Sequence, residues 1–528
     1  MTNCADDGSA GTLRKAIEGA ADGDTIEMSA LACATITLQS GALVSPVPNL
    51  KLKGPGIDAL TIDGNNVDRV LEGTYLDVSD LTIAHGTVLT GAAGCVLAQG
   101  DLSLSRARLT NCLAVSATVG AGGGAAVVFG NLTMHESIIS SSKAIGADVA
   151  AGGGAIVGNN ATLYDSTITG NSAEASQAAA YGGGLYARAI ALHATMIDGN
   201  SAHSISGPAY GGGVHSVLAN IAILDGSAIT GNAATSDTTW SYGGGVNSGL
   251  NTNPAAATVI VENSTISNNT VDSHCTGCFV AGGGIHALDS IAAAYATIDH
   301  NQAVCDDPAT ACSAGGGGLA SFGAQGASSH INLRNCTIST NAAAGGTQVG
   351  ALGAGGGVLA GFDEQIFVHN TTIAFNHASL LGGGIAQSST SNPSELISTI
   401  VADNDNGAGP SDIEVGPIVN NATMSGSNNI VIAAAAGLTL PADTLGDEPG
   451  LLALTTADGG ITATHPLAAG SAAIDSGINP DWLGCDQRGY PYRRVHGASA
   501  DIGAYEFQGE RSIFADNFDA TSACPPAP

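Results

Sequence analysis

The segment Gly182-Gly183-Gly184-Leu185 lies about a third of the way along the chain, and its pattern of three glycines before an aliphatic or alanine residue recurs on both sides. The step from one copy to the next is about thirty residues, stretching to about forty in places. A repeat of this length is typical of a solenoid, a propeller or another array of stacked units. The other copies are Gly122–Ala125, Gly152–Ala155, Gly211–Val214, Gly243–Val246, Gly282–Ile285, Gly316–Leu319, Gly355–Val358 and Gly382–Ile385.

A second signature accompanies the glycines, an isoleucine followed three residues later by an asparagine, as in Ile168 and Asn171. Each repeat therefore holds a strand after the glycines, a middle strand, and a strand ending in Ile-x-x-Asn. Three short strands per turn, stacked at about 4.8 Å, predict an all-β chain folded as a right-handed parallel β-helix. We interpret the asparagines as a structural ladder, in which each side chain bonds to those above and below it. The later members are Asn200, Asn232, Asn269, Asn301, Asn341 and Asn376.

Residues 1–30 are predicted to cap the open end of the solenoid. Leu13 and Ile17 recur with alanines at helical spacing in Thr12–Ala21, while Arg and Lys lie on the other side. A lid is needed because an open end exposes strand edges and core, which promotes aggregation.

The β-helix is predicted to run over residues 31–445, followed by a closing segment at 446–508 and a mostly disordered tail at 509–528. The charged residues of the closing segment are interpreted as a salt-bridged cap over the last turn. They are Asp475, Asp486, Arg488, Asp501 and Glu506.

The formal net charge is −31, with only 14 Lys and Arg residues. Such a chain repels nucleic acid and anionic membrane surfaces, so neither is expected as a partner. It also lacks an apolar run long enough for a membrane-spanning helix. The one basic neighbourhood is interpreted as a solvated face, and it comprises Lys51, Lys53, Arg69, Arg106 and Arg108.

Eleven cysteines indicate an oxidising, extracytoplasmic compartment, so we expect a secreted or cell-surface protein. The chain opens without a charged and apolar leader, so a signal peptide is expected to have been removed. The pair Cys275-x-x-Cys278 favours a loop disulfide over half a zinc site, because no second CxxC accompanies it. The odd count leaves one thiol over. The other spacings typical of disulfides are Cys4 to Cys33, Cys95 to Cys112 and Cys305 to Cys312.

The repeat elements resemble those of bacterial secreted β-helix proteins, namely the GGA(I/L/V) and FxxN repeats of polymorphic outer-membrane and autotransporter-like passengers. Thr12–Ile17 is similar to the CSLREA-type N-terminal segment, and the elements at 473–477, 486–489 and 501–506 resemble the choice-of-anchor Q type of C-terminal region. The resemblance implies a β-helix and export from the cell. It implies no particular activity.

Aromatic and imidazole side chains gather beside the glycines on a few consecutive turns. Strand alternation predicts that they point outward, where flat rings with polar tips suit stacking on sugars. The alternative is an aromatic stack that only stiffens the wall. The candidate binding residues are Tyr181, Tyr210 and Tyr242 before the glycines, Tyr186, His215, Asn247 and His286 after them, and Trp240 beside Tyr242.

A polysaccharide-degrading enzyme would be either a lyase or a glycoside hydrolase. A lyase must neutralise a substrate carboxylate, yet Arg188 and Arg334 are the only basic residues between Lys143 and Arg488, which counts against a lyase unless Ca²⁺ acts instead.

A glycoside hydrolase needs two carboxyls about 5–10 Å apart. Asp198 and Asp299 share a column but are expected three turns apart, at about 15 Å. If the protein is an enzyme, His215, His286 and Asp198 are the catalytic candidates. No calcium-binding nonapeptide or other metal or cofactor motif is present, although scattered aspartates could hold Ca²⁺ loosely.

The first hypothesis is thus a non-catalytic, adhesin-like β-helix protein that binds glycans or partner proteins on its outer face. The alternative is a polysaccharide hydrolase or lyase acting at the aromatic and histidine face. A third hypothesis is a purely structural rod.

Overall fold

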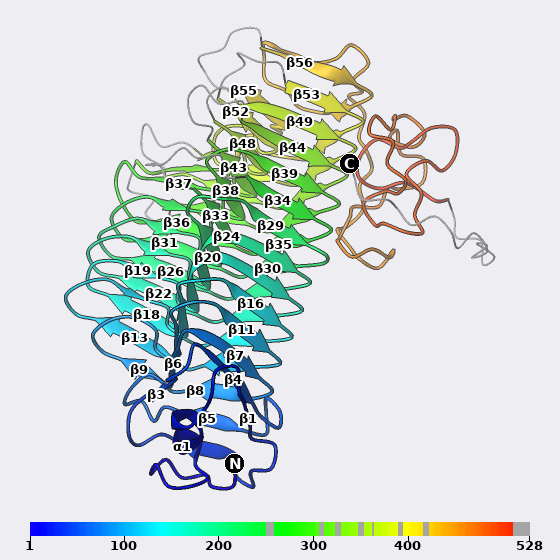
Figure 1. Ribbon diagram of the computed structural model, residues 1–528. Coiled ribbons are helices and arrows are strands. Elements are labelled where there is room, and N and C mark those ends of the chain that lie inside the picture. The colour runs from blue at the N-terminus through cyan, green and yellow to red at the C-terminus, as the bar shows by residue number, and fades with distance from the viewer. Residues whose placement is uncertain are drawn as a thin grey trace. The chain divides into compact units, whose positions relative to one another are not determined.

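A computed structural model describes residues 1–249, 258–305, 311–322, 329–346, 353–361, 364–388, 394–415 and 422–509. Almost all regular structure is β, and strands of successive turns pair in parallel (Figure 1). This confirms the predicted all-β parallel coil. The chain divides into two compact units, the first formed by 1–222, 227–250 and 269–275 and the second by 223–226, 251–268 and 276–528.

In the first unit, four parallel sheets form the walls of the coil. Sheet B contains β2 (Thr35–Thr37), β5 (Thr61–Asp63), β8 (Thr82–Ala84), β12 (Arg108–Thr110), β17 (Ile138–Ser140), β21 (Thr167–Thr169), β25 (Met196–Asp198) and β30 (Ala228–Thr230). Sheet C contains β9 (Thr87–Val88), β13 (Leu113–Ser116), β18 (Lys143–Gly146), β22 (Ser172–Ala175), β26 (Ser201–Ser204), β31 (Ala233–Ser236) and β36 (Thr270–Ser273).

Sheets A and D meet at the triple glycines. One ladder of sheet A comprises β1 (Thr25–Glu27), β4 (Asn49–Lys53), β7 (Tyr75–Ser79), β11 (Leu102–Ser105), β16 (Leu132–His135), β20 (Ala155–Tyr164) and β24 (Leu185–His193). A second ladder follows the glycines directly, and it includes the first residues of β20 and β24 together with β28 (Val214–Ser216) and β33 (Val246–Ser248). Sheet D precedes the glycines with β14 (Ala121–Gly122), β19 (Ala150–Ala151), β23 (Ala180–Tyr181), β27 (Ala209–Tyr210) and β32 (Ser241–Tyr242).

In the second unit, sheet B continues the same three-residue pattern, with its middle residue buried in the coil. Its strands are β35 (Thr265–Ser267), β40 (Thr297–Asp299), β45 (Thr337–Ser339), β50 (Thr372–Ala374), β54 (Ile400–Ala402) and β57 (Ile430–Val431). Sheet A includes β34 (Val259–Glu262), β39 (Ile291–Ala294), β44 (His330–Arg334), β49 (Gln365–His369) and β53 (Ser394–Ile397).

The glycines are required by both backbone conformation and packing. Gly182 has a φ of 56°, in the left-handed region that L-residues rarely adopt. A Cβ added to Gly184 would lie 3.0 Å from Cγ of Asn200 and 2.8 Å from the carbonyl oxygen of Gly213. The third glycine is therefore needed because the asparagine of its own turn occupies the space beside it.

The predicted asparagine ladder is confirmed. In the first unit the Nδ2 groups of Asn171, Asn200 and Asn232 each donate to Oδ1 of the next asparagine at 2.9–3.0 Å, ending at Asn269. Each member is almost fully buried. The second unit repeats the ladder through Asn301, Asn341, Asn376 and Asn404, which ends on Asp412.

The predicted N-terminal helix is present as α1 (Leu13–Glu18), shorter than expected because it ends at Gly19. Thr12 caps it by accepting from the backbone N–H of Lys15, and Leu13 and Ile17 are buried. No helix among the described residues is long and apolar enough to cross a membrane.

Disulfides join Cys4 to Cys33, Cys95 to Cys112 and Cys305 to Cys312. Cys275, Cys278 and Cys485 are also disulfide-bonded, whereas Cys336 is a buried free thiol. This degree of oxidation is consistent with an extracytoplasmic location.

The segment 446–508 lies against the flank of the second unit, orange to red in Figure 1, and its contacts are not confined to the last turn. Gln487 donates to Oγ1 of Thr297 on β40 and accepts from Oγ1 of Thr337 on β45. Thr372 on β50 accepts from the backbone of Ala504. Further along, Leu467, Ala473, Ile502 and Tyr505 pack on Ile400 and Ile430.

The expected salt-bridged cap therefore needs correction. Arg488 pairs with Asp486 at 2.6 Å, between the rings of Tyr492 and Tyr505. Glu506 is instead 3.7 Å from Arg494, which the sequence interpretation did not include. Asp475 and Asp501 accept hydrogen bonds from backbone N–H groups, and these bonds stabilise turns within the segment. The tail beyond residue 509 lies outside the described residues.

A histidine joins this segment to sheet A. His369 on β49 bonds to Asp481 of the segment at 2.8 Å and to Glu395 on β53 at 3.0 Å, and Arg334 on β44 lies 3.8 Å from the same Asp481 oxygen. Burial alone would lower the pKa of His369, but the two carboxylates outweigh it and raise that pKa above 6.5. The same contact lowers the pKa of Asp481 below 3.8, against the opposing effect of burial.

We predict that Asn232→Ala lowers the free energy of unfolding by about 2–3 kcal/mol, because it leaves the buried N–H groups of Asn200 without their acceptor. The shift in urea midpoint measures this. Thr235→Ala, at a half-buried outward position on the neighbouring strand β31, is the control and should change stability by less than about 0.5 kcal/mol. Equal effects of the two variants would contradict a structural ladder.

We also predict that the segment 446–508 docks most firmly between about pH 4 and 6.5. Because the pKa of His369 is raised, its contacts contribute fully to the stability of docking below pH 6.5, and this contribution is lost as the pH rises through the folded-state pKa. Because the pKa of Asp481 is lowered, this carboxylate also stabilises docking near neutral pH, and its contribution is lost in acid as the pH falls through the folded-state pKa. Hydrogen exchange of the segment should therefore speed up from pH 6 to 9 beyond the intrinsic rate, and His369→Gln should flatten this change. A profile unaltered by His369→Gln would refute it.

Candidate functional site

The structure brings most of the predicted aromatic residues of the first unit together at the corner between sheets D and A. Tyr181 stacks on Tyr210 at a ring-centroid distance of 5.2 Å, and Tyr210 on Tyr242 at 5.7 Å. From sheet A, Tyr186 stacks on His215 at 5.5 Å, and His215 lies 5.2 Å from Tyr181. The two columns therefore face each other across the glycine corner.

The expectation that these side chains face solvent is wrong for most of them. Tyr210 and Tyr242 are only 8% and 7% exposed, and His215 and Asn247 are fully buried and bonded to each other at 2.8 Å. The left-handed glycine turns the chain sharply, so the residues before and after it cover one another. Trp240, at 48% exposure, is the open exception, while Tyr181 and Tyr186 are half-buried.

The proposed catalytic candidates do not form a common site. In the second unit His286 is 2% exposed, packs near Phe322, and has its pKa lowered to about 3 by burial, so it stays neutral. Asp198 lies on sheet B, whereas His215 is buried on sheet A. Asp299 is held by its neighbour His300 at 2.6 Å. None of these arrangements provides a positioned acid and base.

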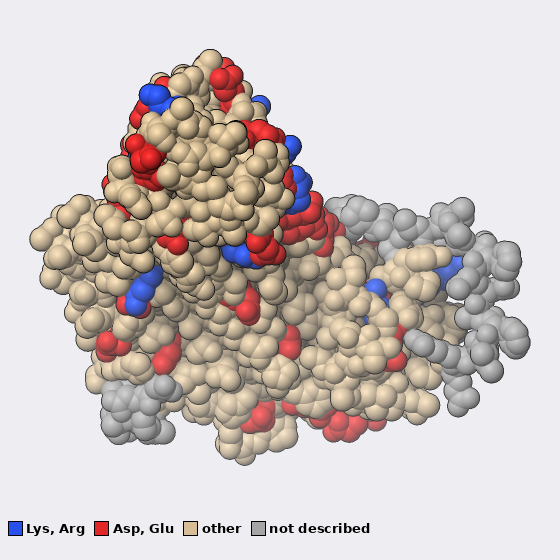
Figure 2. All heavy atoms as spheres, turned by 90° about the horizontal axis from the view of Figure 1, so that it is seen from below, with Lys and Arg blue, Asp and Glu red and all other residues tan. Residues whose placement is uncertain are grey.

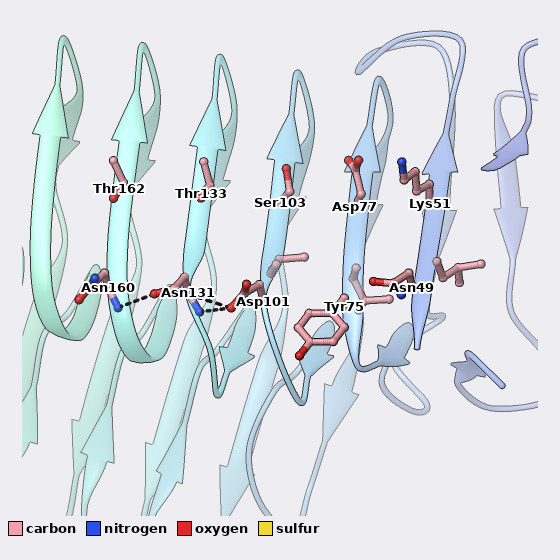
Figure 3. Close-up of a pocket in the computed structure, with 13 residues that line it drawn as sticks. Asn49, Lys51, Tyr75, Asp77, Asp101, Ser103, Asn131, Thr133, Asn160 and Thr162 are labelled. Atoms are coloured by element: carbon pink, nitrogen blue, oxygen red, sulfur yellow. Dashed lines mark hydrogen bonds between the residues drawn. The ribbon is translucent and has the colours of Figure 1, made fainter. Parts of the chain in front are cut away.

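A different surface has the features of a binding site, the outer face of sheet A in the first unit. A groove of about 570 Å³ crosses β4, β7, β11, β16 and β20 (Figure 3). Its outward side chains form two columns. The first column contains Asn49, Tyr75, Asp101, Asn131 and Asn160, and the second contains Lys51, Asp77, Ser103, Thr133 and Thr162.

The first column is held in place by hydrogen bonds between turns. Asn131 donates from its backbone and its Nδ2 to Oδ1 of Asp101, at 2.7 and 3.1 Å, and accepts from the backbone of Asn160 at 3.3 Å (Figure 3). Asn49 donates in the same way to Asp22. These bonds fix amide and carboxylate groups along the edge of the groove.

Tyr75 supplies an aromatic ring to the groove, and it is 45% exposed. A Cβ on Gly100 would lie 2.6 Å from Cε1 of Tyr75, so the ring rests directly on this glycine. The position of the ring thus depends on a neighbouring residue without a side chain.

A third column runs beside the second, through Lys53, Ser79, Ser105, His135, Tyr164 and His193. The rings of His135 and Tyr164 stack at 4.7 Å, and those of Tyr164 and His193 at 4.8 Å. Because the rings cover each other's faces, they offer their edges outward. These ring edges lie one column beyond Thr133 and Thr162, which line the groove.

The basic residues near this face do not form a positive patch. Lys53 pairs with Glu27 at 3.3 Å and Arg106 with Asp80 at 2.7 Å. Arg69 and Arg108 pair likewise with carboxylates. Figure 2 shows one face of the molecule, on which basic side chains are few and several lie next to acidic ones. Over the described ranges, no group of three or more His, Cys, Asp or Glu side chains is arranged to hold a metal ion.

Sequence reasoning missed this groove, although a signal was present. Ser103, Thr133 and Thr162 recur at about the repeat length, each two residues after Asp101, Asn131 or Asn160. The aromatic residues beside the glycines form the more conspicuous repeat. Isolated hydroxyl and amide residues can be recognised as neighbours on one surface only when the register of the strands is known.

No protein-family model matches the chain, and neither a curated protein nor a solved structure matches it significantly. The function must therefore be inferred from the residues of the site itself.

We predict that the buried corner is structural. Tyr210→Ala should lower the free energy of unfolding by about 3 kcal/mol, because it removes a stacked and buried ring. Trp240→Ala removes an exposed ring close by and should cost less than about 0.5 kcal/mol. Chemical unfolding of both variants measures the difference, and a Tyr210→Ala protein as stable as Trp240→Ala would contradict the assignment.

Proposed function

We propose that this protein is an extracytoplasmic glycan-binding protein, which holds carbohydrate in the groove on sheet A of its first unit. The groove itself is the observation that supports this. It combines an exposed ring, Tyr75, with hydroxyl, amide, carboxylate and ammonium groups along five neighbouring strands. Carbohydrate recognition needs such a combination, because a sugar presents an apolar ring face and a rim of hydroxyls.

Location outside the cytoplasm is part of the proposal. The disulfides support it, and the resemblance to secreted β-helix proteins agrees with it. Fractionation of the native host cells would distinguish a released protein from one held at the cell surface.

One observation favours a hydrolase as the second candidate function. Asp77 and Asp101 both line the groove from adjacent strands, with Asp101 fixed by Asn131. The diagonal between such positions spans about 8 Å between Cα atoms, within the order of separation that paired carboxyls need in glycosidases. The earlier enzymatic candidates lack this support because His215 and His286 are buried.

The test is an array of plant, algal and bacterial polysaccharides, read for retention, for new reducing ends and for unsaturated products. We predict that Tyr75→Ala weakens retention by about tenfold, because a stacking ring is lost. Gly100→Ala should also weaken it, since the added methyl would displace the Tyr75 ring. Trp240→Ala, which removes an exposed ring outside the groove, should bind as the unaltered protein does.

Retention of no polysaccharide, or retention insensitive to Tyr75→Ala, would refute binding at this groove. Release of product that Asp77→Asn or Asp101→Asn abolishes, with retention preserved, would establish the hydrolase instead.

A further inference from the structure

Resting on the proposed function, the geometry points to one ligand class: an extended, uncharged, β-linked glycan that lies along the solenoid axis, with about one sugar residue per strand. Four properties of the groove support this ligand, namely its direction, the ring stack beside it, its charge and its end.

The direction follows from the dimensions of the polar surface. Along the axis the two groove columns continue from β4 to β20, over four strand spacings or about 19 Å. Along a strand, the first and second columns are two residues apart, or about 7 Å. A chain that contacts both columns throughout must therefore run across the strands. An extended β-linked glycan suits this path, because its sugar residues advance by about one strand spacing each.

The ring stack beside the groove has the same spacing as the strands. His135, Tyr164 and His193 present ring edges at successive spacings of 4.7 and 4.8 Å, next to the short side chains of Thr133 and Thr162. On β16 and β20 the turn thus offers one polar group from the first column, one from the second and one from this stack. A polymer with a hydroxyl-bearing unit at every turn can use all three.

The charges of the groove are of both signs, which disfavours a uniformly charged polymer. Lys51 and Asp77 are direct neighbours in the second column, and Asp101 follows in the first. A polyanion would meet both aspartates, and a polycation would meet the lysine. On β16 and β20 the two groove columns carry only Asn and Thr side chains. Uncharged hydroxyls can bond to every one of these groups.

The groove also has a defined end. On β24 the first and second columns continue as Ala189 and Ala191, which pair with Asn160 and Thr162. The side chain of alanine offers no hydrogen bond, so the polar lining of the groove, which starts on β4, ends on β20. Affinity should therefore increase with chain length up to about five sugar residues and then remain constant.

The experiment is calorimetry of the full chain with uncharged β-linked oligosaccharides of increasing length, and with oligouronates and amino-sugar oligomers as charged comparators. We expect the uncharged series to gain affinity up to about the pentamer. Thr162→Ala, at the far end, should weaken pentamer binding by about threefold to tenfold and leave dimer binding near Tyr75 unchanged. The matched control Thr169→Ala, a half-buried outward threonine of sheet B, should change neither.

Tighter binding of either charged series would overturn the inference, as would affinity independent of length or a pentamer insensitive to Thr162→Ala. In all three cases glycan binding at the groove would survive. If no oligosaccharide or polysaccharide binds, the proposed function fails and the inference fails with it.

Discussion

The buried asparagine column is the interaction on which the rest of the coil depends. Each Asn side chain serves the turn above and the turn below, and its second amide hydrogen reaches an isoleucine carbonyl, as Asn200 does with Ile168. The column leaves no room for a Cβ at the third glycine, Gly184. Glycine and asparagine are therefore required together, which explains why the two signatures recur together. An unsatisfied amide inside the coil would cost far more than one bond contributes.

The glycine corner also explains why conspicuous residues and functional residues differ here. Gly182 turns the backbone so sharply that Tyr181 and Tyr186 contact each other at a centroid distance of 5.9 Å. The side chains around the corner consequently form a second, smaller core outside the coil, to which His215 belongs. Aromatic rings at such a corner stabilise the turn stack, and a ligand cannot reach the buried ones.

The fold could be predicted from the sequence because its determinants are local and repeated. The period and the Asn ladder follow from residues about thirty positions apart, whereas the predicted three strands per turn were too few, because the strands of a turn lie on four sheets. The candidate site could not be predicted, because exposure is not a property of alternation alone. Strand alternation directs His215 out of the coil, yet the tyrosines of sheet D bury it. Ser103 and Thr133 are neighbours on one surface because β11 and β16 pair in this register, which the sequence does not show. The flank covered by the segment 446–508 was missed for a similar reason, since its contacts join residues more than a hundred positions apart.

The outward columns themselves show what each face contacts. Where the closing segment covers sheet B in the second unit, the outward positions include Ile400 and Ile430, which are fully buried. On sheet A of the first unit, the outward positions in register over five strands are Ser, Thr, Asn and Asp, together with Lys51 and Tyr75, and they remain open. Exposure of an apolar column to water is unfavourable unless protein covers it, whereas a polar column is stable in water and available to a ligand. Polar side chains that are also fixed by bonds between turns, as Asp101 and Asn131 are, lose less freedom when a ligand binds. This pre-organisation is the physical reason to look for function at the groove rather than at the aromatic corner.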